Sequence, residues 1–383
     1  MASLRRKLIE TLKTVSAPIT YPIYGIKRSL TTTSTTWERT DDAVGLVANA
    51  QSGNTAVRND FDSIYPWSDI ISYNYDATND IINAYYGDNN FAFDGSNGDV
   101  LTLIPEFYYK RWQDSTYEYI QISQGQFEGS IKSEEFSVGR YIITGSTSRV
   151  YSRSGYTPFT THTIAEFRNY ANNLGPKFSQ LDWHYFVLQL LYLVEYADYN
   201  SQNILGTGYT DGKSSAHNTG GCDFLGMKSG SYNKTSSSYQ VCYRGIEDIF
   251  GNIQEFVDGI NVNGNNAYIC YDKTKYANNQ YSGNYSLIGI PSPAHDSAKS
   301  DSIKQMGYDS NNPLLMLALK IETQTSTNLY IPDEAHYDMG ERIYMCGGNY
   351  LITAYGVGLF YQNFAGANTI STPRIGARLI KLK

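Results

Sequence analysis

The sequence predicts an α+β fold in which two helices accompany many short strands. Hydrophobic residues make up 41% of the 383 residues, which suffices for a buried core and argues against disorder of the whole chain. Charged residues make up only 17%, whereas there are 35 tyrosines and 33 glycines, a composition typical of short strands and ordered loops. The clearest helical patterns lie in the middle of the chain. We therefore expect a loop-rich fold with modest strand content.

Two helices are predicted in this middle region. Thr163 and Glu166 form a capping box that starts the first helix, and Gly175 followed by Pro176 ends it. The second begins after Asp182, in DWHYFVLQLLYLVEYA. Its apolar residues at helical spacing are Trp183, Phe186, Val187, Leu190, Leu191 and Val194. Because short strands follow the helices, we expect both helices to pack against one side of an irregular antiparallel sheet.

The strand patterns begin nearer the N-terminus. A turn cluster, DGSNGD, occupies residues 94–99 and precedes VLTLIPEFYYKRW, where the internal proline predicts an edge strand or strand ends. A further strand is predicted in EEFSVGRY. We place a domain boundary at the turn cluster, which gives a small β-rich N-terminal region at residues 1–100 and a larger domain at residues 101–383.

Charge and hydropathy exclude several classes of partner. The net charge is −7 and the basic residues are dispersed, so no nucleic-acid partner is expected. The start, MASLRRKLIETLK, is compatible with an amphipathic helix and lacks the apolar stretch of a signal peptide. No window approaches the roughly 18 apolar residues of a membrane span, so membrane insertion is not expected. The sequence predicts a soluble protein made in a cytoplasm.

Motifs for metal or nucleophilic chemistry are not evident in the sequence. The four cysteines are scattered and are predicted to be buried free thiols; they are Cys222, Cys242, Cys270 and Cys346. The five histidines form no zinc motif, and no nucleophile elbow or phosphate-binding loop occurs. The Asp- and Asn-rich loops around Asp272 and residues 278–284 are candidates for a structural Ca²⁺, without EF-hand spacing. No other cofactor is expected, and metal content stays unassigned.

The segment YRGIEDIFGNIQEFVDGIN has a turn followed by a strand pattern. Gly251 and Asn252 suit the positive φ of a tight turn. The alternation from Asn252 to Val257 predicts a half-buried strand, with Ile253 and Phe256 on its buried side.

This segment resembles the GNVWEW signature of the formylglycine-generating-enzyme branch of the C-type lectin fold, written here as GNIQEF. Two further signatures of that branch, an RGGSW-type turn and a terminal GFRL, are similar to CGGNY and GARL in this chain, in the same order and at similar spacing. The oxidases of the family carry a reactive cysteine pair between these two signatures. This chain has no cysteine after Cys346. Thiol chemistry requires the thiol, so we expect a binding protein rather than an enzyme.

The segment that replaces the cysteine pair, YLITAYGVGLFYQNF, resembles the variable segment of diversity-generating-retroelement target proteins. The resemblance implies that residues of about 347–380 form a display segment on a fixed lectin-type frame. The implied ligand-binding residues are Tyr350, Ile352, Thr353, Tyr355, Phe360, Tyr361, Gln362 and Asn363. The implied frame residues are Gly251, Asn252, Gly347, Gly348, Gly376 and Arg378, with Arg378 in an internal ion pair. Tyrosine offers a large ring and a hydrogen-bonding tip at little entropic cost, as in antibody paratopes.

The N-terminal region resembles the start of phage and prophage tail-associated proteins. The phrases that carry this likeness are YGIKRSLTTTSTTWERTDDAVGL, YPWSDI and DGSNGDVLTLIPEFYYK. The resemblance implies a protein of the phage tail, in the virion or encoded by a prophage. Its implied partners are a bacterial cell-surface receptor, protein or glycan, and other tail proteins. Tail fibres of this type are often trimers, so the resemblance is compatible with a homotrimer.

Two alternatives to a receptor-binding protein remain from the sequence. One is an enzyme of the same fold that acts through oxygen or metal chemistry rather than thiols. The other is a purely structural tail component without a ligand.

Overall fold

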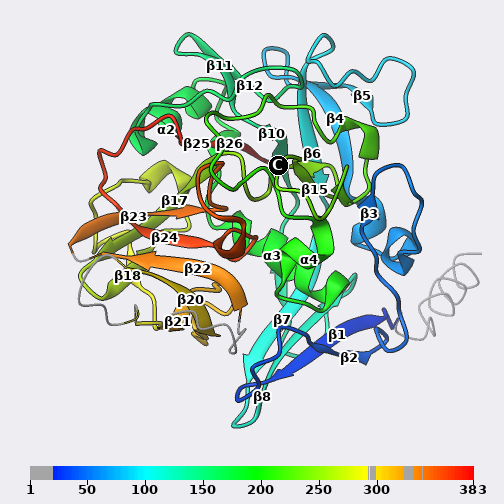
Figure 1. Ribbon diagram of the computed structural model, residues 1–383, viewed down its shortest axis with the longest axis vertical. Helices are drawn as coiled ribbons and strands as arrows, with labels where there is room; N and C mark the ends of the chain where they lie inside the picture. Colours follow the sequence, from blue (N-terminus) through cyan, green and yellow to red (C-terminus); the bar gives the residue numbers. More distant parts are fainter. Residues whose placement is uncertain (1–19, 292, 294–298, 323–330, 339) are drawn as a thin grey trace, which may run out of the picture.

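The computed structural model describes residues 20–291, 293, 299–322, 331–338 and 340–383 (Figure 1). The expected N-terminal amphipathic helix and His295 lie outside these residues. Within them, 26 strands and three α-helices form a mostly β fold that is roughly α+β. The strand content therefore exceeds the modest content that the composition predicted.

The largest sheet has nine strands and contains most of the C-terminal third of the chain, drawn in yellow, orange and red in Figure 1. Its strands follow the order β19-β18-β17-β23-β24-β22-β20-β21, and β25 pairs with β17. Their bounds are β17 (Gln254–Asn263), β18 (Asn266–Ile269), β19 (Ser286–Leu287), β20 (Lys299–Met306), β21 (Ala318–Glu322), β22 (Ile331–Tyr337), β23 (Glu341–Cys346), β24 (Gln362–Gly366) and β25 (Ile375–Gly376).

A six-stranded sheet, β13-β26-β10-β6-β4-β5, joins segments from both ends of the chain. Its strands are β4 (Ile71–Asp76), β5 (Ile81–Tyr85), β6 (Asp99–Ile104), β10 (Phe136–Ile142), β13 (Phe178–Gln180) and β26 (Arg378–Leu382). The predicted domain boundary falls inside β6. Strands on either side of that boundary therefore share this sheet, and Tyr73 and Tyr75 of β4 pack in one hydrophobic cluster with Leu379 of β26.

Three smaller sheets complete the strand pairing. One has five strands: β1 (Ile23–Ser29), β2 (Glu38–Asp41), β7 (Phe107–Gln113), β8 (Tyr117–Ser123) and β9 (Ile131–Ser133). Another has four: β3 (Gln51–Ser52), β14 (Gly230–Ser231), β15 (Val241–Tyr243) and β16 (Ile246–Glu247). The third pairs β11 (Thr144–Ser146) with β12 (Arg149–Tyr151).

The predicted strand in VLTLIPEFYYKRW is divided by its proline. Pro105 lies between the end of β6 and the start of β7, so the prediction of strand ends is confirmed. The alternative of an edge strand is wrong, because β6 lies between β10 and β4 and β7 lies between β8 and β9. The chain turns at the proline, and each half finds partners on both sides.

The first predicted helix is α2 (Ile164–Asn172), and its capping box is present. The Thr163 hydroxyl accepts the Glu166 backbone N–H, while the Glu166 carboxylate accepts the Thr163 N–H (2.7 Å). Phe167 packs on Phe256 of β17. The helix α4 (Ser201–Leu205) was not predicted. The short 3₁₀ helices are η1 (Asp60–Ser63), η2 (Trp67–Asp69), η3 (Asp223–Leu225), η4 (Lys273–Lys275) and η5 (Ala354–Gly356).

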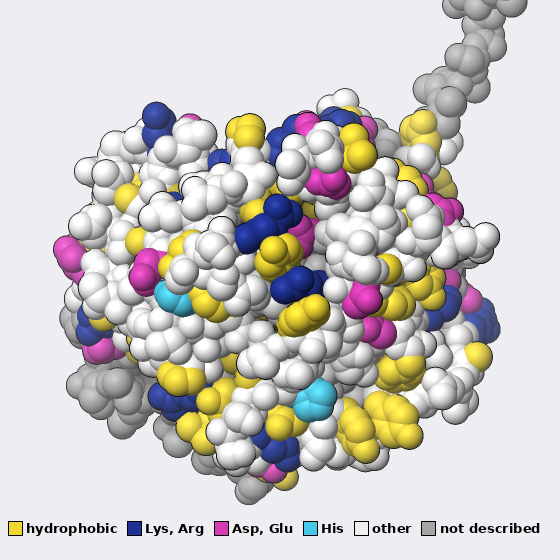
Figure 2. Space-filling model, turned by 90° about the horizontal axis from the view of Figure 1, so that it is seen from above, with side chains coloured by type: hydrophobic (Ala, Val, Ile, Leu, Met, Phe, Trp, Pro, Cys, Tyr) yellow, Lys and Arg dark blue, Asp and Glu magenta, His cyan; other side chains and the backbone are white. Residues whose placement is uncertain are grey.

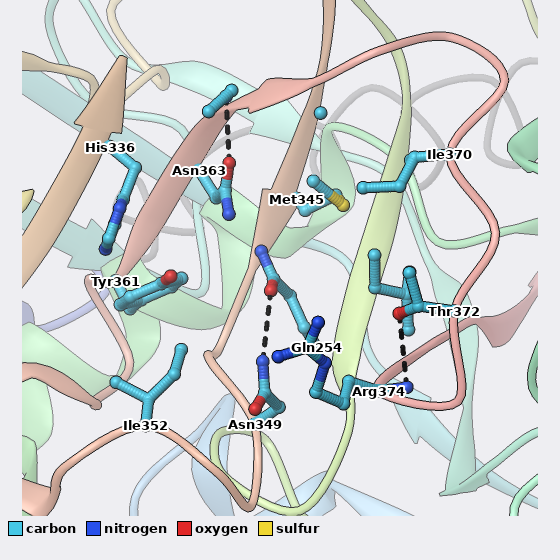
Figure 3. Close-up of a pocket in the computed structure, with 13 residues that line it drawn as sticks. Gln254, His336, Met345, Asn349, Ile352, Tyr361, Asn363, Ile370, Thr372 and Arg374 are labelled. Carbon is cyan, nitrogen blue, oxygen red and sulfur yellow. Dashed lines mark hydrogen bonds between the residues drawn. The ribbon is translucent and has the colours of Figure 1, made fainter. Parts of the chain in front are cut away.

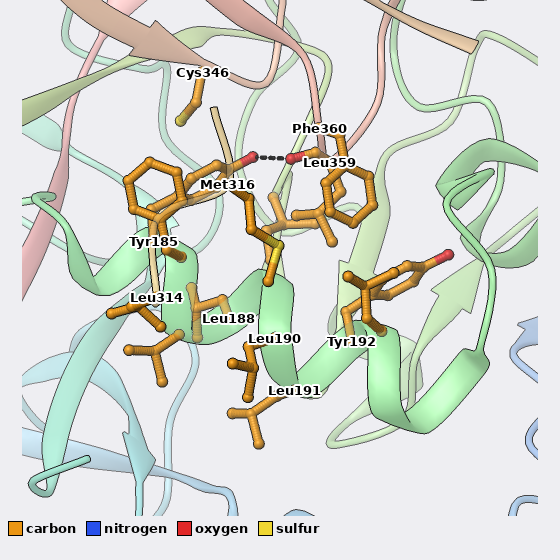
Figure 4. Close-up of a cluster of buried hydrophobic side chains, with 14 of the residues drawn as sticks. Tyr185, Leu188, Leu190, Leu191, Tyr192, Leu314, Met316, Cys346, Leu359 and Phe360 are labelled. Carbon is orange, nitrogen blue, oxygen red and sulfur yellow. Dashed lines mark hydrogen bonds between the residues drawn. The ribbon is translucent and has the colours of Figure 1, made fainter. Parts of the chain in front are cut away.

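The second predicted helix is α3 (His184–Tyr196), and every one of its residues is buried. Its core cluster includes Ile26 of β1 and Phe364 of β24, which belong to different sheets. The helix therefore lies among several sheets at the centre of the molecule, rather than on one side of a single sheet as predicted (Figures 1 and 4). The reason is its composition, since a helix that is apolar all round must be covered all round.

The strand β17 differs from the half-buried strand that its alternation predicted. Nine of its ten residues are buried, including the polar side. Glu255 pairs with Arg378, Asp258 accepts two hydrogen bonds from Arg168 (2.7 and 2.8 Å), and Asn261 donates to two backbone carbonyls. Both faces of β17 can be covered because these buried polar side chains have hydrogen-bond partners.

Candidate functional site

The segment that follows β23 forms most of the wall of a concavity of about 270 Å³ (Figure 3). We call it the terminal concavity. It is lined by Gln254, His336, Met345, Asn349, Ile352, Tyr361, Asn363, Ala365, Gly366, Ile370, Thr372, Arg374 and Ile375. Ten of these 13 residues lie within the predicted display segment, residues 347–380.

The nine-stranded sheet sets the floor of the terminal concavity. Strand β24 lies between β23 and β22, antiparallel to the first and parallel to the second. This register places Asn363 opposite both Met345 and His336. Strand β25 pairs in parallel with the start of β17, which brings Ile375 beside Gln254. Side chains from five strands thus converge on one hollow.

The glycine turns hold the start of the display segment. Gly347 and Gly348 have φ of 79° and 63°, and Gly251 and Asn252 have φ of 78° and 56°, so the predicted positive φ at the second pair is confirmed. The Gly251 N–H donates to the Gly347 carbonyl (2.7 Å), which ties the two turns together. The chain therefore leaves β23 along a fixed path.

Asn252 fixes the start of the display segment, and its side chain is fully buried. Its Oδ1 accepts the His217 N–H (2.8 Å), and its Nδ2 donates to the His217 carbonyl (3.0 Å) and to Asp248 Oδ2 (2.8 Å). Its backbone carbonyl accepts the Tyr350 N–H (2.9 Å). The geometry fits the frame role that the resemblance implied.

Arg378 closes the other end of the segment. It is buried and pairs with Glu255, with 2.6 Å between Nη2 and Oε1. Its guanidinium also donates to four backbone carbonyls, those of Gly139, Arg140, Glu247 and Asp248. The expected internal ion pair is therefore present. Gly376 lies in β25, where a side chain would meet Ile253.

Two predicted display residues, Phe360 and Gln362, are fully buried and line neither of the hollows described here. Phe360 packs on Tyr199 with 4.9 Å between ring centroids. Gln362 accepts the Ala318 N–H (2.9 Å) and donates to the Met316 carbonyl (2.7 Å). The chain before them is fixed to α3, because the Tyr185 hydroxyl donates to the Leu359 carbonyl (2.6 Å; Figure 4). These two residues are corrected from display to structural roles.

Of four other display residues, three line the terminal concavity and Tyr350 does not. Ile352, Tyr361 and Asn363 line the terminal concavity, although the Tyr361 ring is only 1% exposed and lies beside His336 (5.4 Å between centroids). Burial raises the pKa of Tyr361, as does the nearby Glu334. Tyr350 is largely buried against Ile142 and Ile253.

The remaining two predicted display residues, Thr353 and Tyr355, are the most exposed of the eight. Thr353 is exposed, and Tyr355 is 78% exposed on the turn η5. Tyr355 lines a second hollow of about 580 Å³. We call it the polar groove, and its other lining residues are Asn200, Gln202, Asn203, Thr207, Asp211, Lys234, Thr235, Ser237, Pro332 and Ala354. The turn from Ile352 to Tyr355 therefore contributes to both hollows.

Three residues of the terminal concavity lie outside the predicted display segment. Gln254 belongs to the quoted GNIQEF motif, and Met345 immediately precedes CGGNY, so the motifs themselves pointed to this region. His336 had no sequence signal, because only the parallel pairing of β22 with β24 brings it there. Arg374, Thr372 and Ile370 lay inside the segment but were not singled out.

The groups that carry metal or thiol chemistry do not gather at this site. Among the described residues, no group of three or more His, Cys, Asp or Glu side chains is arranged to hold a metal ion. Asp272 caps η4 by accepting the Thr274 N–H (2.9 Å). All four cysteines are free and buried, as predicted, and burial raises the pKa of the Cys346 thiol.

The surface seen from above shows Lys and Arg side chains dispersed among neutral ones (Figure 2). In the described part of the chain, no helix has both the length and the apolar character needed to cross a membrane. Comparison with models of known protein families and with curated protein sequences found no match to this chain.

Proposed function

We propose that this chain is a receptor-binding protein of a phage or prophage tail. In this proposal a C-type-lectin-type frame presents residues 347–380 to a ligand on a bacterial surface, and the protein performs no catalysis. The motif resemblance to formylglycine-generating-enzyme-like and retroelement-diversified proteins supports the frame, and the N-terminal phrases support the tail.

One observation carries the proposal. The segment that the sequence singles out as a display region supplies ten of the 13 residues of the terminal concavity. A display segment need not surround a hollow, and its residues might equally have packed in the core, as Phe360 and Gln362 do. Binding sites are usually concave, with apolar walls and a few converging polar groups. The terminal concavity has this composition.

The turn between the two hollows provides the outermost contacts. Tyr355 projects from it with 78% exposure, and Ile352 lines the terminal concavity three residues earlier. Exposed aromatic side chains with few rotatable bonds are efficient contact residues in paratopes. We assign Ile352 and Tyr355 as the principal contacts.

The test is adsorption of the purified, fluorescently labelled chain to a panel of bacterial strains, measured by flow cytometry. The double variant Ile352→Ala/Tyr355→Ala should reduce saturable adsorption to the responsive strains by roughly tenfold or more, the size expected for two interface anchors. Neither side chain is fully buried, so the variant should keep the wild-type unfolding temperature.

A matched control is available on β5. Ile81 and Tyr85 are 50% and 41% exposed on another sheet, so Ile81→Ala/Tyr85→Ala removes the same two side-chain types away from both hollows. This control should adsorb like the wild type. Equal adsorption by the wild type and both double variants would overturn the assignment of the binding surface.

A further inference from the structure

The amide side chains of the terminal concavity have orientations set by backbone groups. Asn349 Oδ1 accepts the Leu351 N–H (3.0 Å), so its Nδ2 is the group that faces Gln254 and donates to Oε1 (3.4 Å; Figure 3). The Nε2 of Gln254 is therefore turned the other way. This nitrogen is buried and has no hydrogen-bond partner in the described part of the chain.

A second amide donor lies beside it. Asn363 Oδ1 accepts the Ala365 N–H (2.8 Å), which leaves Nδ2 on the side of the concavity. Figure 3 shows the Gln254 and Asn363 nitrogens turned toward the same space, next to Met345. The Asn363 side chain also interacts with the Tyr361 hydroxyl, and its NH₂ group has two hydrogens to donate. An unpaired buried donor costs free energy, so a ligand acceptor oxygen placed here gains the missing bond.

The charges around the concavity favour an anion. None of its 13 lining residues is Asp or Glu, whereas Arg374 is among them. Glu334, which pairs with His336 Nε2 at 3.2 Å, is not among the lining residues. Arg374 is exposed at the rim, so its guanidinium is available to a carboxylate in two-point geometry.

The remaining walls are apolar and the space is small. Met345, Ile352, Ile370 and Ile375 surround the amides with aliphatic or thioether side chains. The volume of about 270 Å³ exceeds the roughly 150 Å³ of an engineered cavity that takes benzene. It lies just below the range of about 300–1,000 Å³ of sites for drug-sized ligands. One compact group fits, and an extended chain does not.

We propose that the terminal concavity binds a carboxylate carried on a compact aliphatic body, with the acceptor oxygens on Gln254 Nε2 and Asn363 Nδ2 and the charge facing Arg374. The inference rests on the proposed function, because it names the chemistry that the display surface recognises. The source of the carboxylate, an acidic sugar or a peptide end, is distinguished by the probes below.

The experiment is a titration of the full-length protein followed by the side-chain NH₂ resonances of Gln254 and Asn363. The probes are N-acetyl-L-valine, its neutral isostere N-acetyl-L-valinamide, glucuronate and glucose. At least one carboxylate should shift both amide resonances saturably, and its neutral counterpart should bind roughly tenfold more weakly, as expected for loss of a charged hydrogen-bond partner.

The decisive variant is Asn363→Asp, which keeps the acceptor for the Ala365 N–H and replaces the donor NH₂ group with a negatively charged oxygen. It should abolish carboxylate binding while preserving the unfolding temperature, and Arg374→Gln should weaken binding severalfold. Asn203→Asp, an exposed residue of the polar groove, is the matched control and should bind like the wild type.

Three results would overturn the inference: no resonance shift with either carboxylate, equal binding of the neutral isosteres, or full binding by Asn363→Asp. These outcomes are separable from the proposed function. Adsorption to cells that depends on Ile352 and Tyr355, without carboxylate binding, would retain the receptor-binding surface and remove only its ligand class. Carboxylate binding without adsorption to any strain would retain the site and remove the receptor-binding function.

Discussion

At the residue scale, Asp333 supports the loop that leads into β24. Its Oδ2 accepts the Phe360 N–H (2.6 Å), while its buried Oδ1 has no hydrogen-bond partner among the described residues. The loop passes close above it, because a side chain at Gly358 would collide with the Asp333 carboxylate. Burial raises the pKa of Asp333 to about 8, against the lowering effect of the Phe360 N–H.

This raised pKa predicts that Asp333 destabilises the fold as pH rises. Between the unfolded pKa, near 4, and about 8, the unfolded chain releases a proton that the folded chain keeps, so stability falls with pH across that window. Asp333→Asn keeps an acceptor oxygen and removes this loss. The stability of the variant relative to the wild type should therefore increase with pH, by at most about 1.4 kcal/mol per pH unit. Denaturant unfolding at a series of pH values measures it.

The control for this titration has the opposite sign. The Arg58 hydrogen bond lowers the pKa of Asp60, so its contribution is present above the unfolded pKa and is lost as pH falls. The stability that Asp60→Asn loses relative to the wild type should be largest above the unfolded pKa and should shrink as pH falls through the lower folded pKa. An Asp333→Asn variant whose stability follows the wild type at every pH would contradict the role of Asp333.

Single residues also mark where sequence reasoning fails. The residue types in YLITAYGVGLFYQNF predicted a contact segment, but a strand alternates its faces, and a shift of one residue exchanges inside and outside. Phe360 and Gln362 are inside, whereas Ile352 and Asn363 line the concavity. That choice depends on Tyr185, Ala318 and Met316, which are remote in the sequence.

At the element scale, two sets of contacts hold β26 in place: its backbone pairing with β10 and β13, and the side chain of Arg378. The guanidinium links β26 to Glu255 of β17 and to carbonyls of β10 and β16. Arg378→Met should destabilise the protein by about 3–5 kcal/mol, because it leaves Glu255 charged and buried. Arg378→Lys should also destabilise the protein strongly. A lysine ammonium cannot donate to Glu255 and to the four backbone carbonyls at once, as the planar guanidinium does.

Urea unfolding measures both substitutions. Arg58→Ala is the control, because it removes an arginine from an exposed pair with Asp60 and should change stability little. A change of that small size in both Arg378 variants would show that the buried pair does not hold the strand.

Helices were easier to predict than strands for a physical reason. The capping box of α2 and the apolar run of α3 are local features, and both helices are present near the predicted positions. Strand partners are not local: β24 pairs with β22 and β23, while β26 pairs with β10, more than 200 residues earlier. The sequence therefore predicted short strands after the helices, without their bounds or their neighbours.

At the scale of the whole molecule, strands from the first third of the chain and the last strand belong to one sheet. The boundary predicted near residue 100 rested on a turn cluster, yet strands β4, β5 and β6 share a sheet with β26. A local turn signal does not reveal which sheet the next strand enters. The terminal concavity is likewise built from segments that are distant in the sequence. The motifs pointed to residues 347–380 and to the neighbouring Gln254 and Met345, but not to His336.

The most direct measurement is DNA sequencing of this gene across sibling strains. If residues 347–380 are a diversified display surface, codon differences should occur at adenines of codons 349–372. They should concentrate on residues that are exposed or line the terminal concavity, such as Ile352, Tyr355 and Asn363. The buried Phe360 and Gln362 should be unchanged. Identical codons in all siblings, or differences spread equally over buried and exposed positions, would contradict the proposed display surface.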